Sequence, residues 1–231
     1  MIEVAYVCHM GCDLLVANAA RRSFDNQHTF WTDAPRSGRA RSDAQLVADL
    51  ARDGHLLPFR HPQITLACTA PLPIARQLGK HQVGFSWSEV SRRYKTKGIT
   101  FHQIEAWRSD VKDRRQGSGD LLPDVANNTL AAIQWRNIQR CMAEYEQALE
   151  LGASPEQARF LLPQSMDVVW TWTGSLLGWA QLVQGRSHPD VQAETREFAQ
   201  ACSAIIAPIF PVSWAALAGW QPSPTEVETA A

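Results

Sequence analysis

The chain has 231 residues, of which 45% are hydrophobic and 19% charged, and its formal net charge is -1. These values are typical of one folded domain, and without a basic excess they argue against general nucleic-acid binding. No apolar run approaches the roughly 20 residues that cross a membrane, and the first residues lack the charged and apolar regions of a signal peptide. We therefore expect a cytoplasmic protein without membrane contact.

The first residues are expected to alternate between short strands and short helices. Residues 2–7 alternate apolar and polar side chains, as a strand does, and residues 14–24 form a helix-like run. Ser42 and Gln45 resemble a capping box, which predicts a helix that Gly54 ends.

Two more strands and a short helix are expected next. Residues 63–69 are typical of a strand, and the prolines that follow introduce a short helix carrying Arg76 and Gln77. Residues 98–107 alternate again and predict a third strand.

The second half is expected to be mostly helical. Residues 130–152 repeat apolar side chains at helical spacing, and Ser154 begins a new short helix. Residues 165–183 are apolar on nearly every face, which predicts a buried central helix, and a last helix is expected over residues 189–206.

This order of elements predicts an α+β fold, with a small early sheet and long helices in the C-terminal half. One domain is expected over residues 1–220. The segment 221–231 has the composition of a disordered tail.

The stretch from Arg76 to Tyr94 combines cations and hydroxyls with a single carboxylate. Guanidinium forks match phosphate oxygens, hydroxyls and backbone N–H groups complete such a cradle, and amides can read a base edge. The stretch therefore suits a phosphorylated, planar ligand, although its composition also fits a solvated charged loop. Its cations are Arg76, Lys80, His81, Arg92 and Arg93, its amides are Gln77 and Gln82, its hydroxyls are Ser86, Ser88 and Ser91, and its acid is Glu89.

The five cysteines predict neither a disulfide framework nor a metal site. Their number is odd and their spacing irregular, which favours reduced thiols. Cys8, His9 and Cys12 lack a second pair of ligands, so packed thiols are the better interpretation and no metal is expected.

The same stretch resembles the signature of the flavin-dependent thymidylate synthases, the ThyX family. That signature is R-H-R-x-x-S-x-N-E-x-S-x-R-Y, and residues 86–94 read S-W-S-E-V-S-R-R-Y. Further blocks resemble the family in order: HMGCDLLVANAARRSF, GHLLPFRH, APLPIARQL, QGSG, EQARFLLP and WTWTGSLLGWAQLVQGR. Several ordered blocks are more specific than one motif, and together they imply the ThyX fold over nearly the whole chain.

Several positions depart from the family pattern. The R-H-R triplet is Lys80-His81-Gln82, with one extra residue before Glu89, and the family's asparagine is Ser88. Positions that usually face the flavin from the late helix are Ser175, Leu177 and Gln181 by the same register. Lys80 and Gln82 cannot form the bidentate hydrogen bonds of the family's arginines, so a flavin would be held differently.

The resemblance implies a homotetramer with FAD at subunit junctions and a pyrimidine nucleotide stacked on the flavin. The family reaction methylates C5 of dUMP, using methylenetetrahydrofolate and reduced flavin that NADPH restores. Flavin carries the redox chemistry in such an enzyme.

The resemblance also implies roles for individual residues. Arg186 matches the catalytic arginine beside the uracil ring, where a cation stabilises developing negative charge, although the same arginine could simply complement a helix dipole. The implied nucleotide-binding residues are Gln77, Glu89, Ser91, Arg92, Arg93, Arg159 and Arg186. The implied cofactor-binding residues are Ser23, His61, Thr65, Lys80, His81, Gln82, Glu89, Ser175 and Gln181.

Substrate and activity leave alternatives open. The departures at Lys80, Gln82 and Ser88 favour a specialised branch that methylates UMP instead of or alongside dUMP, as in nucleoside-antibiotic pathways. The rivals are an ordinary dUMP-only synthase and a non-catalytic homologue that only binds pyrimidine nucleotides. Cys68 could serve as a nucleophile, as in the unrelated synthase class, but without a neighbouring base it is expected in the core.

Overall fold

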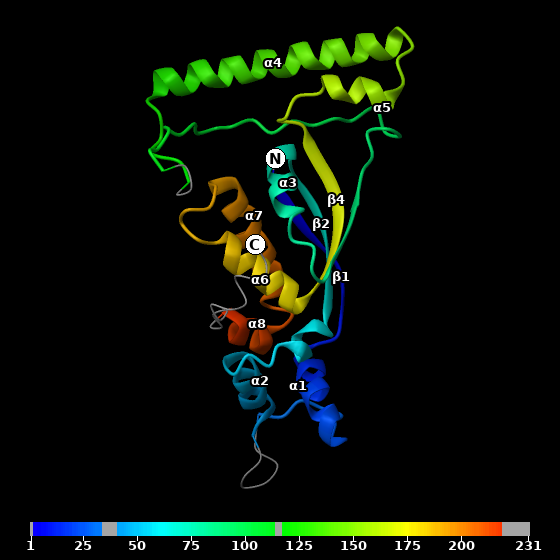
Figure 1. Cartoon of the computed structure of the whole chain (residues 1–231), viewed down its shortest axis with the longest axis vertical. Coiled ribbons are helices and arrows are strands. Elements are labelled where there is room, and N and C mark those ends of the chain that lie inside the picture. The colour runs from blue at the N-terminus through cyan, green and yellow to red at the C-terminus, as the bar shows by residue number, and fades with distance from the viewer. Residues whose placement is uncertain (1, 34–40, 114–116, 219–231) are drawn as a thin grey trace.

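The computed structural model describes residues 2–33, 41–113 and 117–218, so the tail predicted over residues 221–231 lies outside the described part. The molecule is elongated, with α4 across one end, α1 and α2 at the other, and the sheet between them (Figure 1). Its strands are β1 (Glu3–Met10), β2 (Gln63–Pro71), β3 (Phe85–Glu89) and β4 (Asp167–Ser175). Its α-helices are α1 (Asp13–Arg21), α2 (Asp43–Arg52), α3 (Leu72–Leu78), α4 (Asp124–Glu150), α5 (Pro155–Ala158), α6 (Leu176–Arg186), α7 (Ala193–Ile206) and α8 (Pro211–Ala218). The short 3-10 helices of the described residues are η1 (Arg22–Phe24), η2 (Leu57–Arg60) and η4 (Arg159–Leu161).

The four strands form one antiparallel sheet in the order β1-β2-β4-β3. Trp172 of β4 lies opposite Leu66 of β2 and opposite Trp87 of β3. These three side chains therefore share one face, because residues paired across strands point the same way. The α+β class is confirmed, but one central strand comes from the C-terminal half.

The prediction of one buried helix over residues 165–183 is wrong. Its first part is β4, and α6 begins only at Leu176, where the Ser175 hydroxyl caps the helix by accepting from the Gly178 backbone N–H at 3.1 Å. The run Trp170-Thr171-Trp172-Thr173 alternates with a period of two and consists of aromatic and β-branched residues, which favour strands. Because this strand lies in the middle of the sheet, its sequence has the high apolar content that is also typical of a buried helix.

The strand predicted over residues 98–107 is also wrong. This segment makes only an isolated bridge between Phe101 and Met166, and the side chain of Gln134 on α4 bonds the backbone of His102 and Ile104. An amide side chain thus satisfies backbone groups that a neighbouring strand would otherwise pair. The remaining strand is β3, inside the polar stretch of the expected binding site.

Most other predicted elements are confirmed. Ser42 and Gln45 form a complete capping box at the start of α2, and Gly54 follows that helix with a φ of 71°. The last long helix begins at Ala193, later than expected, and is followed by α8. Asp13 of α1 accepts hydrogen bonds from the first backbone N–H groups of α8, joining two helices from opposite ends of the sequence.

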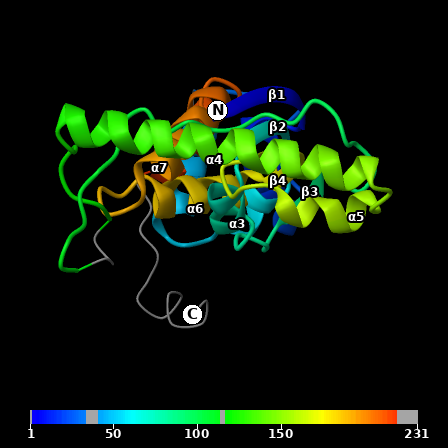
Figure 2. The ribbon, with the colours of Figure 1, turned by 90° about the horizontal axis from the view of Figure 1, so that it is seen from above.

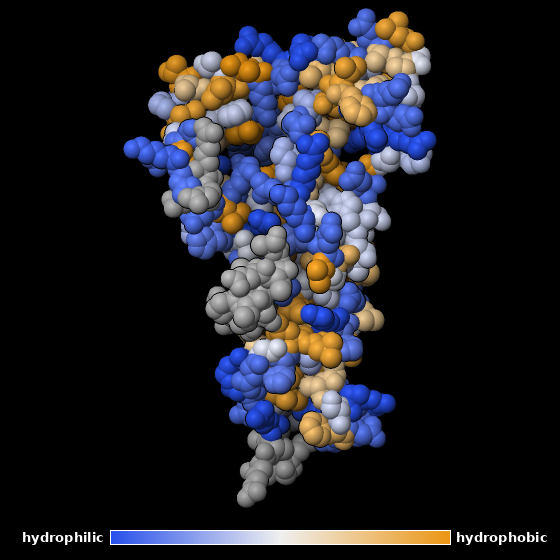
Figure 3. Space-filling view, viewed as in Figure 1, coloured by the Kyte–Doolittle hydropathy of each residue, from blue (hydrophilic) through white to orange (hydrophobic). Residues whose placement is uncertain are grey.

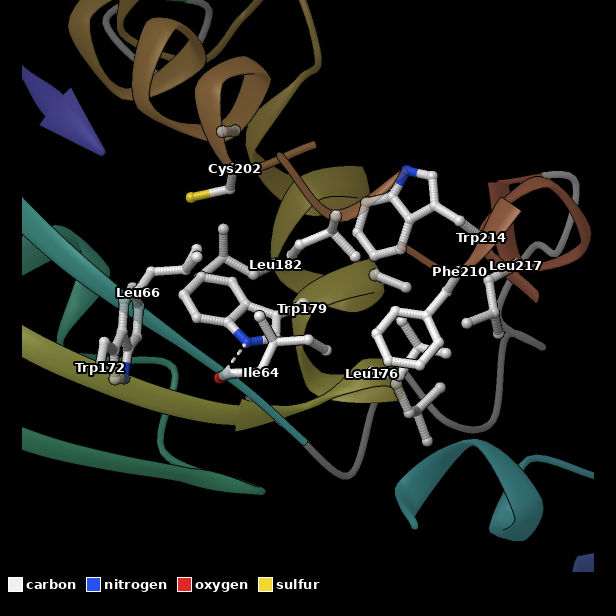
Figure 4. Packing of buried hydrophobic residues seen from close by; sticks show 14 of the residues in the cluster. Ile64, Leu66, Trp172, Leu176, Trp179, Leu182, Cys202, Phe210, Trp214 and Leu217 are labelled. Carbon is white, nitrogen blue, oxygen red and sulfur yellow. Dashed lines mark hydrogen bonds between the residues drawn. The ribbon is translucent and has the colours of Figure 1, made fainter. Parts of the chain in front are cut away.

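The core lies between the sheet and the helices α3, α6 and α7, which cover one of its faces (Figures 1 and 2). Trp179 of α6 is fully buried there and donates its Nε1–H to the Ile64 carbonyl at 3.1 Å (Figure 4). Trp87 stacks on Trp170 with ring centroids 4.3 Å apart, so β3 is tied to the core by aromatic packing. Within the described residues, no helix combines the length and apolar character needed to cross a membrane.

Candidate functional site

The first group of predicted site residues lies where α3 meets the end of α6. Gln77, Lys80 and Arg186 line a cavity of about 700 Å³, which we call the Arg186 cavity. Its opposite wall comes from residues 104–108 and from the segment leading into α7. An amide from α3, an ammonium from the turn after it and a guanidinium from α6 therefore face one space.

Arg186 is held at this cavity by His81. The Arg186 Nε donates to His81 Nε2 at 2.8 Å, although the two residues lie 105 positions apart in the chain. Burial and the charge of Arg186 lower the pKa of His81 to about 4, so the imidazole is neutral near pH 7. Its Nε2 can then accept, its proton sits on Nδ1, and the terminal nitrogens of Arg186 remain for a ligand.

Gln77 is also fixed by hydrogen bonds. Its Nε2 donates to Gln192 Oε1 at 2.9 Å, and its Oε1 accepts from the Thr195 hydroxyl at 2.9 Å. Both partners belong to the N-terminal end of α7. The amide of Gln77 is therefore oriented before any ligand binds.

A second cavity, of about 490 Å³, joins further predicted residues to aromatic side chains. Its lining includes Arg76, His81, Gln82 and Glu89, with Phe85, Trp87 and Trp172 as apolar wall. We call this space the Trp87 cavity. Glu89 lies at the end of β3 and accepts from Trp87 Nε1 at 3.2 Å, and Arg76 donates to Gln164 at 3.1 Å. Because His81 lines this cavity and bonds Arg186, the two cavities share one residue pair as a border.

A third group, Ser91, Arg93 and Arg159, has the chemistry of a phosphate site. Glu156 connects the two arginines, because its carboxylate pairs with Arg93 Nε at 3.0 Å and its carbonyl accepts from Arg159 Nε at 3.2 Å. The Ser91 hydroxyl accepts from the Arg93 backbone N–H at 3.2 Å. Both arginines are exposed, so their guanidinium groups can receive a bidentate anion.

Arg92 differs from its neighbours because its side chain points into the protein. Only 7% of the residue is exposed, and its Nη1 donates to the carbonyls of Lys95 and Lys97 at 3.5 Å each. The side chain thus holds the following turn in place. The resemblance implied a phosphate contact through the backbone at Arg92, and the inward side chain is compatible with that prediction.

The remaining predicted cofactor residues are spread along the molecule. Ser23 is exposed in η1, His61 is exposed just after η2, and Gln181 is exposed on α6. The Thr65 hydroxyl bonds that of Thr173 at 2.9 Å on the half-buried outer face of the sheet. Ser175 is 5% exposed and its hydroxyl accepts from the Gly178 N–H as the cap of α6, which leaves the hydroxyl proton as its remaining donor.

The phosphate-type group and the Arg186 cavity are not adjacent within one chain. Arg93 and Arg159 gather at α5 and η4, whereas Arg186 ends α6. Both ribbon views place α5 and α6 apart, with β4 between them (Figures 1 and 2). No hydrogen bond or ion pair of the described residues joins the two groups.

Sequence reasoning missed the far wall of the Arg186 cavity. Arg108 donates to Glu194 at 3.1 Å there, next to Trp107 and Gln192. These residues come from two separated segments without a shared motif, so nothing in their spacing indicated that they meet. The polar N-terminal turn of α7 was the only local signal.

Cys68 has no features of a nucleophile. It is 1% exposed on β2, and burial raises the pKa of its thiol to about 12. A thiol with such a pKa stays protonated near neutral pH. Cys8 and Cys12, by contrast, are exposed rather than packed.

The sequence over residues 6–212 matches the model of a protein family described as thymidylate synthase complementing protein. The chain is 31% identical over 214 residues to a flavin-dependent thymidylate synthase of Thermus thermophilus, covering 92% of this chain and 74% of that relative. It is 31% identical over 175 residues to the enzyme of the same description from Synechocystis, covering 75% of this chain and 79% of that relative.

Solved structures agree with these sequence matches. The UMP/dUMP methylase PolB from Streptomyces cacaoi bound with 5-Br UMP has a TM-score of 0.80 at 25% identity, covering 94% of this chain and 93% of PolB. The form bound with 5-Br dUMP has a TM-score of 0.78 at 26% identity, covering 95% and 96%. The chain therefore belongs to the flavin-dependent thymidylate synthase family of methyltransferase-type enzymes.

Proposed function

We propose that this protein transfers a one-carbon unit to C5 of a uridine monophosphate, with UMP and dUMP both accepted. Methylenetetrahydrofolate would supply the carbon, and FAD reduced by NADPH would supply the hydride. The observation that carries the proposal is the Arg186–His81 pair beside the fixed amide of Gln77, in a cavity that a uracil ring would fit. Membership of the family connects this arrangement of residues with the methylation of a uracil nucleotide.

Arg186 is the residue we assign to catalysis. Bond formation from C5 to the one-carbon unit requires negative charge to build up on the uracil ring, and a guanidinium at the ring stabilises that charge where water is excluded. His81 accepts a hydrogen bond from the Nε–H of Arg186, and this bond fixes the plane of the guanidinium. Because His81 is neutral, it adds no second cation that would push Arg186 away.

The residues at the border of the two cavities fit a flavin. A flavin needs an apolar surface for its ring and polar groups for its phosphates, and the lining of the Trp87 cavity combines aromatic side chains with His81 and Gln82. The exposed Lys80 supplies a positive charge nearby, although without the bidentate fork of the family arginine. When bound there, the flavin would supply hydride chemistry that no side chain provides.

The phosphate of the nucleotide would be held by Arg93, Arg159 and Ser91 of another copy. Within one chain these residues lie away from Arg186, whereas a symmetric assembly can place them at a neighbour's cavity. Exposed hydrophobic side chains around α4, including Val125 at 81% and Leu151 at 81%, support such contacts (Figure 3). We therefore propose a homotetramer with each site shared between copies.

The substrate class rests on the likeness to PolB, which was crystallised with 5-Br UMP and with 5-Br dUMP. The departures at Lys80, Gln82 and Ser88 are consistent with a branch that differs from ordinary synthases. A role in making a nucleoside antibiotic would follow from methylation of UMP, and it is part of this proposal.

Stepwise reduction and reoxidation of the protein tests the proposal. We expect purified protein to carry FAD, NADPH to bleach the flavin without oxygen, and methylenetetrahydrofolate with UMP or dUMP to restore the yellow colour. Mass spectrometry should then detect the 5-methylated nucleotide. Arg186→Gln should lower the rate of methylation by about 100-fold or more, because a charge-stabilising donor at the reacting ring is lost.

Arg52→Gln is the matched control, since Arg52 is exposed at the end of α2 and pairs only locally, with Asp49 and with Asp53 at 2.9 Å. It should leave the rate unchanged. A colourless protein that binds UMP but not added FAD would instead identify a non-catalytic binding homologue. Methylation of dUMP alone would identify an ordinary synthase.

A further inference from the structure

The phosphate-type group has an internal attachment, the buried side chain of Arg92. Its neighbour Arg93 has 58% of its side chain exposed, whereas only 7% of Arg92 is exposed. The Arg92 Nη1 donates to the carbonyls of Lys95 and Lys97 at 3.5 Å each. A guanidinium can only donate and a carbonyl can only accept, so the direction of these bonds is unambiguous. Arg92 therefore connects the end of the turn to the protein interior.

The backbone around Arg92 forms a turn that carries two members of the phosphate-type group. The Ser91 carbonyl accepts from the N–H groups of Tyr94 and Lys95 at 3.1 and 3.0 Å. The Ser91 hydroxyl accepts from the Arg93 N–H at 3.2 Å. These bonds fix the Ser91 hydroxyl and the Arg93 backbone relative to each other. The position of the turn in the molecule depends on the Arg92 side chain as well as on β3, which precedes it.

Two buried polar residues from other elements act on the charge of Arg92. Burial lowers the pKa of Arg92, and the neighbouring Tyr145 and Asp167 oppose this shift. Each of these two residues is 1% exposed, Tyr145 on α4 and Asp167 at the start of β4. A buried cation costs stability that an apolar side chain of similar length would not cost, so its presence here favours a specific role.

The elements next to Arg92 are also those that flank Arg159. The chain runs from α4 through α5 and η4, which begins at Arg159, into β4, and α5 lies beside α4 (Figures 1 and 2). On the surface, Glu156 pairs with Arg93 Nε at 3.0 Å, and its carbonyl accepts from Arg159 Nε at 3.2 Å. Arg92 therefore relates the turn, from the inside, to both ends of the segment that carries Arg159.

We infer that Arg92 is a positioning residue for the phosphate of the nucleotide, because its buried side chain holds the turn that presents Ser91 and Arg93. The inference rests on the proposed function, in which these two residues and Arg159 bind that phosphate. A site built from exposed arginines depends on their placement, since bidentate hydrogen bonds form only in a narrow geometry. Arg92 makes no contact with the uracil ring under this assignment, so its loss should affect a nucleotide and spare a nucleoside.

Two substitutions separate the donors of Arg92 from its bulk. Arg92→Met keeps an unbranched, flexible chain but removes every donor, whereas Arg92→Lys keeps the charge without the planar fork. Tyr145→Phe is the matched control from the same neighbourhood, because the buried Tyr145 hydroxyl has no hydrogen-bond partner among the described residues. Thermal unfolding of each variant shows whether the fold is kept.

The measurement compares UMP with uridine, which has the same ring and ribose but no phosphate. Calorimetry on FAD-loaded protein gives the dissociation constant of UMP, and displacement of UMP gives that of uridine. Arg92→Met should weaken UMP binding by about 10-fold or more, the range of one hydrogen bond to a charged group, and uridine binding by less than about 2-fold. Arg92→Lys should weaken UMP binding by about 3-fold, and Tyr145→Phe should change the binding of neither ligand.

Two results would overturn the inference while the proposed function stands: wild-type affinity for UMP in Arg92→Met, or an equal loss for UMP and uridine. Wild-type protein that binds UMP no more tightly than uridine would instead overturn the phosphate site of the proposed function itself. If Arg92→Met does not fold, Arg92→Lys decides the question. A loss confined to UMP then supports the inference, and unchanged or equally weakened binding of both ligands contradicts it.

Discussion

His81 illustrates how single residues in this site depend on their partners. An exposed histidine would be partly protonated at mildly acidic pH, but burial and the neighbouring Arg186 lower the pKa of His81 to about 4 from an ordinary 6.5. The neutral ring accepts from Arg186 Nε at 2.8 Å. Protonation would remove this acceptor and leave two cations in contact.

Stability should therefore depend on pH through His81. Between pH 6.5 and about 4 the unfolded chain binds a proton on this residue that the folded chain does not, so stability falls as the pH is lowered through this window. His81→Asn keeps an acceptor for Arg186 but cannot titrate. Urea unfolding across this range should show a shallower loss of free energy for His81→Asn than for wild type, and equal slopes would contradict the assignment.

At the scale of elements, the site depends on how closely β3 approaches β4. Phe85 lies opposite Gly174, packs 4.6 Å from the ring of Trp172, and contacts Trp179 edge-on. A Cβ at Gly174 would lie 2.3 Å from the Phe85 ring. The missing side chain thus lets β3 bring Glu89 to the Trp87 cavity.

Gly174→Ala should therefore destabilise the protein by about 1–3 kcal/mol, because Phe85 must move out of a packed aromatic cluster. Gly185→Ala is the opposite control: nothing lies within 4 Å of a Cβ there. That change should stabilise α6 by up to about 1 kcal/mol, since alanine is the better helix former. Chemical denaturation measures both, and a loss of the same size in the two variants would contradict the close-approach argument.

The sequence predicted those elements whose signal is local. The capping box at Ser42 and the helical repeat of α4 depend on neighbours within a few turns, and both are confirmed. β4 and β3 were missed because their strand conformation depends on pairing with strands that are far away in the sequence. This pairing places Trp170 on the buried face of the sheet and Thr171 on the opposite face. Motif resemblance named Arg186 and His81, but only the fold shows that they bond each other.

At the scale of the whole molecule, the separation of two arginine groups becomes the main constraint. Arg93 and Arg159 share Glu156 near α5, while Arg186 lies at the end of α6, on the other side of β4 in both ribbon views (Figures 1 and 2). In the proposed function, Arg186 would hold the uracil ring, and Arg93 with Arg159 would hold the phosphate. If sites are shared between copies, each copy supplies Arg186, the ring half, to one site. It supplies Arg93 and Arg159, the phosphate half, to another site.

Mixing two inactive variants tests this sharing. Arg93→Ala and Arg186→Ala should each lose activity alone, because every site then lacks one half. Co-expressed in equal amounts, they should recover about one intact site in four, since random pairing brings an unchanged phosphate half to an unchanged ring half at that frequency. The activity of the purified mixture, measured as methylated nucleotide per bound FAD, reports the fraction. A double variant that carries both changes on one chain, co-expressed with wild type in equal amounts, should also give about one intact site in four. Absence of recovery in a mixture proven by mass spectrometry to contain both chains would place the whole site within one copy.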